Sequence, residues 1–552
     1  MAKARSGDEL VFLPLGGAGE IGMNLNCYGF GPERARKWIA VDCGVMFGRE
    51  AGTPGVDVIM PDARFLVENR SDLLGLVLTH AHEDHIGAVA HLWPELRCPI
   101  YATPFTARLV AGKLEEAGLL GQPRLNVVPL GGSLVLGPFA IEFITLTHSI
   151  PEPNAIAIRT PLGTIVHTGD WKIDPDPLIG ETTDDASLRR LGEEGVLAMV
   201  CDSTNALVQG ESGSEGEVRK SLTDLIGSLK GRVAVTAFAS NVARLDTIAK
   251  AARAHRREIV LVGRAMRRIV EAAKETGYLK DFPAVLPEEM AETLEPDRVL
   301  LLCTGSQGEP RAALPRIAAG DHPNIALGPG DSVIFSSRII PGNELAIFEL
   351  HNKLAALGVA VLTEQDHFVH VSGHPAREEL SQMYRWVRPR IAIPVHGELR
   401  HMTEHARLAR ELQVPQAIVV TNGKLVRLAP GKAGIVDEAP AGRLHLDGRL
   451  MVAESEGFAR ARRALGFAGF IGVTLVLDGK GRLAAEPAFH FEGAPPVIEE
   501  VVVEAVRRAL DHYQPRKAST EDLRETVRRA ARRAAQESWG KKPVVRVVAV
   551  EV

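Results

Sequence analysis

Residues 79–85 decide the fold of this chain, and their sequence is Thr-His-Ala-His-Glu-Asp-His. They follow an apolar run that predicts a buried strand, and they precede a segment that predicts the start of a helix. Alternate side chains of an extended segment share one face, so we expect His80, His82 and Asp84 to converge on one point and His85 to reach a second point nearby. Imidazole and carboxylate groups are ligands for zinc or manganese. A solvated polar loop is the alternative, which is disfavoured because so many ligand groups are costly to gather without a cation.

Length and composition exclude several classes of protein. The chain has 552 residues, which predicts two to four domains, and its 45% hydrophobic and 24% charged residues are ordinary for a globular protein. The net charge of −5 carries no overall signature of nucleic-acid binding, although a basic groove can exist within an acidic total. Five cysteines without a CxxC pair argue against a disulfide framework and favour a reducing cytoplasm. The polar N-terminus and the lack of a long uncharged apolar stretch predict neither a signal peptide nor a membrane span.

Further ligand-type residues also follow apolar strands. Asp42, His148, Asp170 and Asp202 end four such runs, and His396 ends another much later in the chain. Each of these residues taken alone is more often structural. Asp42 could equally be a turn residue or orient a ligand histidine from behind. The repetition nevertheless indicates that one edge of a layered sheet structure carries a site.

The pattern changes to alternating strands and helices between residue 214 and about 375. The predicted strands lie near residues 232–237, 258–262, 299–303 and 332–336. This alternation predicts a parallel sheet with crossover helices. Small polar residues follow these strands, including Ser240, Asn241 and Ser306. The carboxyl ends of parallel strands are where such folds bind ligands, and exposed amides there suit phosphate.

The remaining chain predicts a short linker and a small separate domain. Residues 431–450 begin with a glycine- and proline-containing segment that we interpret as a linker. The tail beyond it has its own apolar strands, with a hairpin turn at 478–481. A helix between residues 519 and 539 carries five arginines. We favour a solvated basic face for them over contact with RNA.

The order of these motifs resembles a known family. The spacing of the metal-ligand residues is similar to that of the metallo-β-lactamase superfamily, and the insertion after Asp202 resembles its β-CASP branch, which processes nucleic acids. The whole order, from about residue 10 to the end, resembles the bacterial ribonuclease J family. The stretches that carry the resemblance are residues 16–22, 80–85, 304–309 and 370–374, together with His148, Asp170, Asp202 and His396.

The resemblance implies an α/β fold class with a metallo-β-lactamase αββα sandwich, an inserted β-CASP parallel α/β domain and a small α+β C-terminal domain. The implied boundaries are 1–213 and 378–430 for the sandwich, 214–377 for the β-CASP domain, 431–450 for the linker and 451–552 for the C-terminal domain.

The resemblance also implies two divalent metal ions per subunit, with zinc favoured and manganese or magnesium as alternatives. The implied ligands are His80, His82 and His148 for one ion and Asp84, His85 and His396 for the other, with Asp170 as the bridge. Asp84 would take a proton from water, and His374 would donate one to the leaving 3′ oxygen. Asp202 would orient His374, and Asp42 would support a ligand histidine. The implied substrate-binding residues are Ser240, Asn241, Ser306, His370, Ser372, Gly373 and His374, and no individual role follows for His370.

The implied function is a metal-dependent ribonuclease with 5′-to-3′ exonuclease activity that prefers 5′-monophosphate RNA, together with endonuclease activity. It would act in mRNA decay and rRNA maturation in the cytoplasm, as a homodimer or homotetramer, with RNA-degradation proteins as further partners and without a membrane. Three rivals remain: a lactonase or thioesterase, a DNA-processing β-CASP nuclease, and a scaffold with a dead site. The long insertion disfavours the first, His396 the second, and the complete ligand set the third.

Overall fold

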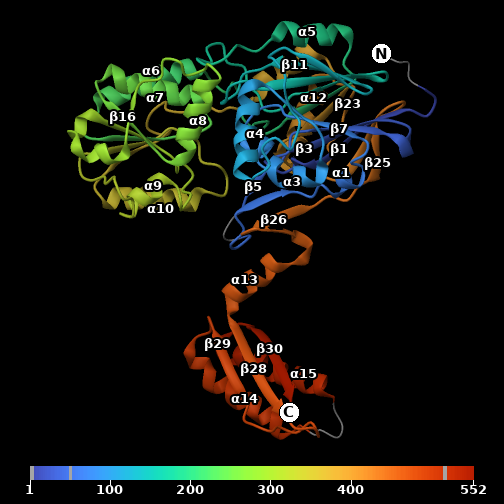
Figure 1. Ribbon diagram of the computed structural model, residues 1–552, viewed down its shortest axis with the longest axis vertical. Coiled ribbons are helices and arrows are strands. Elements are labelled where there is room, and N and C mark those ends of the chain that lie inside the picture. Colours follow the sequence, from blue (N-terminus) through green and yellow to red (C-terminus); the bar gives the residue numbers. More distant parts are fainter. Residues whose placement is uncertain (1–4, 49–51, 514–518) are drawn as a thin grey trace. The chain divides into compact units, whose positions relative to one another are not determined.

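The computed structural model describes residues 5–48, 52–513 and 519–552 and divides into two compact units (Figure 1). The first unit comprises Met1–Met46 and Met60–Gly442, and the second comprises Phe47–Ile59 and Arg443–Val552. The first four residues of the polar N-terminus lie outside the described residues. None of the helices formed by the described residues has the length and apolar character needed to span a bilayer.

Two large sheets of the first unit pack face to face. The strands of the larger sheet, in spatial order, are β25 (Gly434–Glu438), β24 (Lys424–Ala429), β1 (Glu9–Gly16), β3 (Leu25–Gly31), β4 (Lys37–Val41), β7 (Leu73–Val77), β8 (Ile100–Ala102) and β9 (Leu125–Val127). Those of the smaller sheet are β10 (Ser133–Leu136), β11 (Phe139–Thr145), β12 (Asn154–Thr160), β13 (Gly163–His167), β14 (Ala198–Asp202), β21 (Ile391–Val395) and β23 (Gln416–Ala417). Phe12 and Tyr28 from the larger sheet share one buried cluster with Phe143 and Ile156 from the smaller sheet.

Helices cover the outer faces of these sheets. The helices on the smaller sheet are α5 (Asp185–Glu194), α11 (Arg377–Val387) and α12 (Leu399–Glu411), and those on the larger sheet include α1 (Arg64–Glu68), α3 (Val89–Leu96) and α4 (Pro104–Glu116). Leu188, Met383 and Leu408 pack with Val166 and Met199 in a second buried cluster. Because both faces of the central strands are covered, these strands are continuous apolar runs rather than alternating ones. The predicted αββα sandwich is confirmed.

The inserted region forms a fully parallel six-stranded sheet, as predicted. Its strands, in spatial order, are β17 (Val285–Leu286), β16 (Glu258–Val262), β18 (Val299–Cys303), β15 (Val233–Thr236), β19 (Ser332–Phe335) and β20 (Ala360–Leu362). The connecting helices are α6 (Glu215–Ser228), α7 (Val242–Ala254), α8 (Arg264–Glu275), α9 (Ala313–Ala318) and α10 (Glu344–Ala356). Figure 1 shows α6 and α7 on one side of the sheet and α9 and α10 on the other. The strand–helix alternation therefore has its expected origin in crossover connections.

The second unit contains an α+β structure, as predicted for the C-terminal domain. Strand β28 (Phe470–Leu477) pairs antiparallel with β29 (Ala488–Glu492) and parallel with β30 (Val544–Glu551). The helices α14 (Glu499–Asp511) and α15 (Thr520–Trp539) pack on this sheet through one buried cluster. Helix α13 (Phe458–Ala468) precedes the sheet in the chain.

The structure corrects the prediction of a linker at residues 431–450, because this segment contains paired strands. Strand β25 pairs with β24 as an edge strand of the larger sheet, with Val426 opposite Ile435. Strand β26 (Arg443–Asp447) then pairs with β27 (Leu450–Ala453). The glycine and proline of this region make only the turn before β25. The residues after it find backbone partners on neighbouring strands, and a backbone group with a partner no longer needs solvent.

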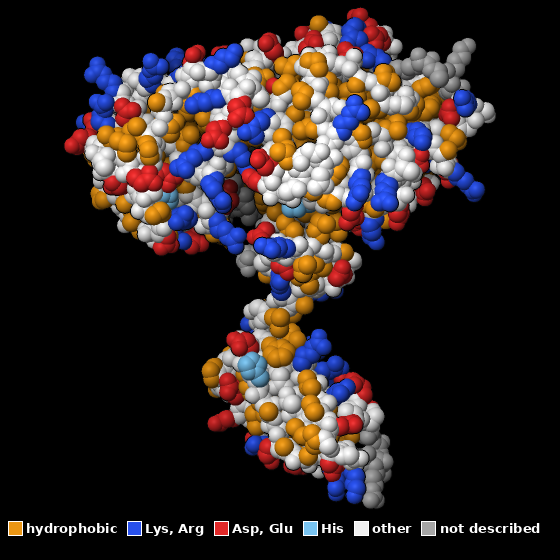
Figure 2. All heavy atoms as spheres, in the orientation of Figure 1, with side chains coloured by type: hydrophobic (Ala, Val, Ile, Leu, Met, Phe, Trp, Pro, Cys, Tyr) orange, Lys and Arg blue, Asp and Glu red, His pale blue; other side chains and the backbone are white. Residues whose placement is uncertain are grey.

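Charges are dispersed rather than gathered on the face of the molecule that Figure 2 shows. On the face shown in Figure 2, Lys and Arg side chains are interspersed with Asp and Glu in both units. In α15, Arg528 and Arg529 both pair with Glu525, and Arg524 pairs with Glu521 at 3.2 Å. These pairs favour the interpretation of the arginine-rich helix as a solvated, internally paired face.

Candidate active site

The candidate site lies where several strands of the sandwich end. The strands β11, β13, β14 and β21 run in one direction, because β11 and β13 are both antiparallel to β12 while β13, β14 and β21 are mutually parallel. His148, Asp170 and His396 lie in the loops after β11, β13 and β21, and Asp202 is the last residue of β14. The histidine-rich loop and the short helix α2 (Glu83–Ile86) follow β7 of the facing sheet. Residues far apart in sequence are thereby brought to one edge.

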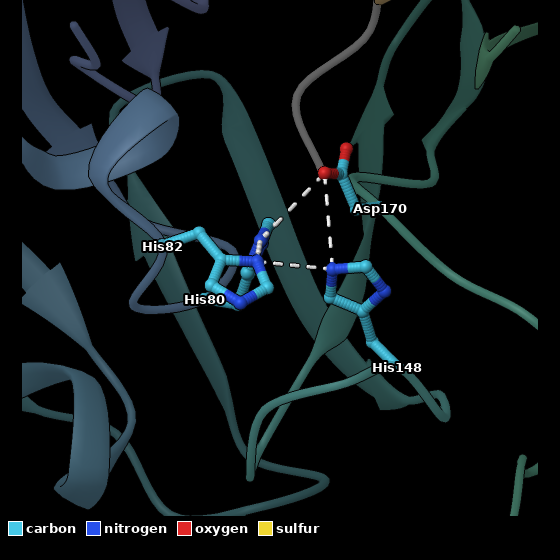
Figure 3. Close-up of side chains that lie close together, drawn as sticks. All are labelled: His80, His82, His148 and Asp170. Carbon is cyan, nitrogen blue, oxygen red and sulfur yellow. Dashed lines mark hydrogen bonds and ion pairs between the residues drawn. The ribbon is translucent and has the colours of Figure 1, made fainter. Parts of the chain in front are cut away.

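One group of ligand-type atoms consists of His80, His82, His148 and Asp170, all within 4.8 Å of one another. Figure 3 shows the three imidazoles and the carboxylate facing a common centre. His82 Nδ1 lies 3.1 Å from His80 Nε2 and 3.0 Å from His148 Nε2. Asp170 Oδ2 lies 3.8 Å from His80 Nε2 and 3.9 Å from His148 Nε2.

A second group consists of Asp84, His85, His396 and the same Asp170. Asp170 Oδ2 lies 3.1 Å from His85 Nε2 and 3.2 Å from His396 Nε2. Asp84 Oδ2 lies 3.6 Å and 3.4 Å from these two nitrogen atoms. Asp170 is therefore shared by both groups, which is the position of a bridging ligand.

The placement of Asp84 corrects the expectation from strand alternation. The chain is extended only as far as His82 and is helical from Glu83 to Ile86. In a helix, side chains no longer alternate between two faces with a period of two. Asp84 is therefore rotated away from His80 and lies with His85 in the second group.

Hydrogen-bond partners behind the two groups orient the ligand-type histidines. His85 Nδ1 lies 2.7 Å from Asp42 Oδ2, and Asp42 Oδ1 accepts a hydrogen bond from the Thr79 amide at 2.8 Å. His80 Nδ1 lies 3.0 Å from Thr79 Oγ1, and His148 Nδ1 contacts the carbonyl oxygen of Gly373. When Nδ1 is engaged in this way, Nε2 is left to face the centre of each group. Asp42 thus lies behind a ligand-type histidine.

The electrostatic environment favours neutral imidazoles in the first group. Burial lowers the pKa of His80 and of His148 well below the usual value and lowers that of His82 to about 3. Burial would raise the pKa of Asp170, but the facing His396 and His85 outweigh it and hold this pKa well below the usual value. The first group therefore combines neutral nitrogen donors with an ionised carboxylate, which is the donor set of a divalent cation.

Unpaired buried atoms show that the residues fit such a cation. Among the described residues, neither carboxylate oxygen of Asp170 nor Nε2 of His396 makes a hydrogen bond, although all three atoms are buried. The short distances from Asp170 Oδ2 to His85 Nε2 and His396 Nε2 are therefore contacts without hydrogen-bond geometry. Buried polar atoms without partners are costly. Atoms that converge on a common point instead have the geometry of ligands.

His374 and Asp202 form a pair beside the two groups. His374 Nδ1 lies 2.8 Å from Asp202 Oδ2 and 3.9 Å from Asp170 Oδ2. Burial alone would lower the pKa of His374, but the charge and hydrogen bond of Asp202 raise it to about 9. Asp202 thus favours the protonated form of His374, and Nε2 is the nitrogen that is not engaged by Asp202.

The segment Val369–His374 runs next to this pair. Asn205 Nδ2 donates to Ser372 Oγ at 2.8 Å, and the His374 amide donates to the same oxygen at 3.2 Å. His370 Nδ1 is buried without a hydrogen-bond partner among the described residues. Burial, followed by the positive charges of three nearby side chains, lowers the pKa of His370 well below the usual value; these are Arg244, Arg338 and Lys172.

The other predicted substrate residues lie in turns of the inserted sheet. Ser240 and Asn241 follow β15, and Ser306 follows β18, where it is buried. Asn241 differs from its prediction as a substrate contact, because its side chain is used within the domain. Its oxygen accepts from the Arg244 amide at 2.9 Å, and its nitrogen donates to Glu215 at 3.1 Å.

Two site residues were given no role in the sequence analysis. Asn24 Nδ2 lies 3.1 Å from His85 Nε2 and 3.1 Å from His396 Nδ1. Asn205 holds Ser372. In the sequence, Asn24 is marked only by the glycine-rich turn before it. The structure explains one of these glycines, because a β-carbon at Gly17 would lie 2.1 Å from Asn24 Oδ1. Asn205 followed Asp202 closely enough to be a candidate.

Comparison with family models gives four matches along the chain. Residues 29–191 match the metallo-β-lactamase superfamily, and residues 230–354 match the ribonuclease J β-CASP domain. Residues 358–419 match the Zn-dependent metallo-hydrolase RNA specificity domain, and residues 458–552 match the ribonuclease J C-terminal domain.

Curated proteins are similar over nearly the full length. The chain is 46% identical to ribonuclease J of Sinorhizobium meliloti, over 99% of this chain and 98% of that protein. It is 39% identical to ribonuclease J of Mycobacterium tuberculosis strain H37Rv, covering 98% and 96%, and 36% identical to that of Thermus thermophilus, covering 99% and 96%. A crystal structure of an Enterococcus faecalis protein of unknown function shares the fold, with a TM-score of 0.51 and 14% identity over 76% of this chain and 100% of that one.

Proposed function

The chain belongs to the ribonuclease J family of metal-dependent ribonucleases, and from this premise we propose that it degrades RNA stepwise from a 5′-monophosphate end and also cuts RNA internally. The observation that carries the proposal is the pair of His374 and Asp202 beside two ligand groups that share Asp170. The proposed biological roles are mRNA decay and rRNA maturation in the cytoplasm. Homodimers or homotetramers and RNA-degradation partners belong to the same proposal.

We assign the two ligand groups to two divalent cations, with zinc as the proposed metal. His80, His82 and His148 would hold one, Asp84, His85 and His396 the other, and Asp170 would bridge them. Three or more imidazole and carboxylate donors per ion suit zinc, and manganese or magnesium are the alternatives. When bound, such a pair acidifies water and neutralises charge on the phosphodiester.

The protein side chains move the protons. Asp84, whose side chain is 29% exposed, is the acceptor for the proton that the attacking water loses. As the bond between phosphorus and the 3′ oxygen breaks, His374 donates its Nε2 proton to that oxygen. Asp202 holds Nδ1 and so keeps the imidazolium oriented.

Cleavage at the 3′ oxygen leaves the phosphate on the shortened RNA. Each cut therefore releases a nucleotide with a 3′ hydroxyl and regenerates a 5′-monophosphate end. The Ser372 hydroxyl and the neighbouring backbone amides are the proposed site for that end. A triphosphate would place additional charge and bulk in the same space, whereas a hydroxyl would leave donors unpaired and weaken binding.

The test uses one RNA sequence with a 5′-monophosphate, a 5′-triphosphate or a 5′-hydroxyl, and a matched DNA. The metal-loaded protein should release mononucleotides from the 5′ end, fastest from the monophosphate. All reactions should share one salt concentration, because phosphate contacts are salt-sensitive. Equal rates on the three RNAs, or release from the 3′ end, would overturn the 5′-end proposal. Preferential cleavage of the DNA would favour the DNA-processing alternative.

A further inference from the structure

Arg244 lies in the core of the inserted domain, and we propose that it positions the segment Val369–His374 and thereby sets the 5′-end preference. This inference rests on the proposed 5′-end function. Arg244 belongs to helix α7 and is completely buried, so it contacts neither solvent nor RNA. Its role is therefore one of positioning rather than catalysis.

The guanidinium of Arg244 joins three parts of the inserted domain. Nε and Nη2 donate to the two carboxylate oxygens of Glu215 at 3.1 Å and 2.9 Å. Nη1 donates to the carbonyl and hydroxyl oxygens of Ser336 at 3.0 Å and 2.6 Å and to the Val369 carbonyl at 2.9 Å. Glu215 begins α6, and Ser336 follows β19. The planar fork of arginine suits this set of acceptors, which a lysine ammonium cannot reproduce.

The Val369 carbonyl is anchored twice. Besides Arg244 Nη1, the Ser336 hydroxyl donates to it at 2.7 Å. Ser336 is buried, and its hydroxyl oxygen also accepts from Arg244. The start of the segment is therefore fixed to the core of the inserted domain by two cooperating donors.

The other end of the segment is fixed to the sandwich. Asn205 holds Ser372, His148 contacts the Gly373 carbonyl, and Asp202 holds His374. Val369 and Ser372 are three residues apart, a reach of roughly 10 Å at most. The segment is thus a short strap between the inserted domain and the ligand-type residues of the sandwich.

The length of this strap determines which phosphodiester linkage of the bound RNA lies at the ligand groups. A 5′ phosphate held beside Ser372 must place the first linkage at the ligand groups, and a misplacement of about 1 Å can lower a rate by 10²-fold. Release of Val369 lets the phosphate donors move relative to those groups. Cleavage at internal positions does not use the 5′ phosphate, so it is expected to change much less.

Arg244→Lys and Ser336→Ala are the test variants, and Arg257→Lys is the matched control. Arg257 is also a buried arginine of the inserted domain, and it also donates to backbone carbonyls, those of Leu229, Gly231 and Val299. None of its partners belongs to the strap. The control therefore reports the general cost of altering a buried arginine in this domain.

The experiment uses the full-length, metal-loaded protein and measures kcat/KM on 5′-monophosphate and 5′-hydroxyl RNA of one sequence. Cleavage of a circular RNA, which has no 5′ end, and the metal content are measured in parallel. Arg244→Lys should reduce the monophosphate preference about 10- to 100-fold, and Ser336→Ala about 3- to 10-fold. Circular-RNA cleavage and metal content should stay near their original values. Arg257→Lys should keep the preference.

An unchanged preference in both Arg244→Lys and Ser336→Ala would overturn the inference while leaving the proposed function intact. An equal loss in Arg257→Lys would overturn it as well, because the effect would then come from general destabilisation. If Arg244→Lys does not fold, the milder Ser336→Ala decides. The absence of a monophosphate preference in the unaltered enzyme would instead overturn the proposed 5′-end function, and the inference with it.

Discussion

Gly373 packs so closely against His148 that a methyl group there must move the ligand-type histidine. A β-carbon at this position would lie 2.7 Å from His148 Cε1, 2.9 Å from its Nδ1 and 2.9 Å from Ser149 Oγ. Favourable contacts between carbon atoms lie near 3.5–4.0 Å, so the ring or the strap has to shift by about 1 Å. The ring has little freedom, because its Nδ1 contacts the Gly373 carbonyl and its Nε2 lies 3.0 Å from His82 Nδ1.

We therefore expect Gly373→Ala to lower RNA turnover about 100-fold, since a displacement of about 1 Å at a reacting centre has an effect of that order. Metal occupancy of the group containing His148 should fall as well. The assay is turnover of 5′-labelled RNA together with elemental analysis of the purified variant. Gly328→Ala is the control, because a β-carbon at Gly328 would meet no atom within 4 Å. Near-normal turnover and full metal content in Gly373→Ala would refute the assignment of His148 as a ligand held by this contact.

His374→Ala should lose roughly 10²–10⁴ in rate while keeping its metal, because a general acid contributes about that much; metal loss on elemental analysis would make His374 a ligand instead. His396→Ala should lose metal from the second group, and full occupancy would exclude it as a ligand. Asp174→Asn should lower the free energy of unfolding by about 3–5 kcal/mol. The buried Asp174 accepts a hydrogen bond from Lys172 at 2.9 Å, and the substitution would leave the buried ammonium of Lys172 without its ion-pair partner. Burial raises the pKa of Asp174, but the charge and hydrogen bond of Lys172 outweigh burial and hold this pKa below its usual value. The stabilisation is therefore fully present above the pKa of the unfolded chain and is lost as pH falls through the folded pKa. Chemical denaturation at pH 7 and pH 3 measures it, and an equal difference between the two proteins at both values would contradict the pairing.

Patterns of short range predicted much of this protein. Alternating strands and helices predicted the parallel sheet of the inserted domain, because crossover connections leave that signature. The apolar strands that end in His148, Asp170, Asp202 and His396 predicted a shared edge, because parallel strands end on the same side. The proposed division of the ligand-type residues between two ions came from the family resemblance rather than from strand geometry.

Contacts of long range lay beyond the sequence. Asp84 was expected on one face with His80 and His82, but the helix begins at Glu83. Asn24 contacts His396 across 372 residues, and no local pattern encodes such a contact. The segment after Pro430 has the composition of a linker, yet an available edge on β24 turns it into a strand. At each of these positions, the observed conformation or contact depends on tertiary partners rather than on local propensity.

The central claim is that Asp170 bridges two divalent cations and that RNA hydrolysis depends on both. The direct measurement is the metal content per subunit and the RNA turnover of Asp170→Asn beside the unaltered protein, with Asp437→Asn, an exposed carboxylate on edge strand β25, as the control. We predict two cations in the unaltered protein and in the control. In Asp170→Asn we predict fewer cations and a rate lower by several orders of magnitude, because the cation pair stabilises the charge that develops in the reaction. Two cations and near-normal turnover in a folded Asp170→Asn protein would contradict the account.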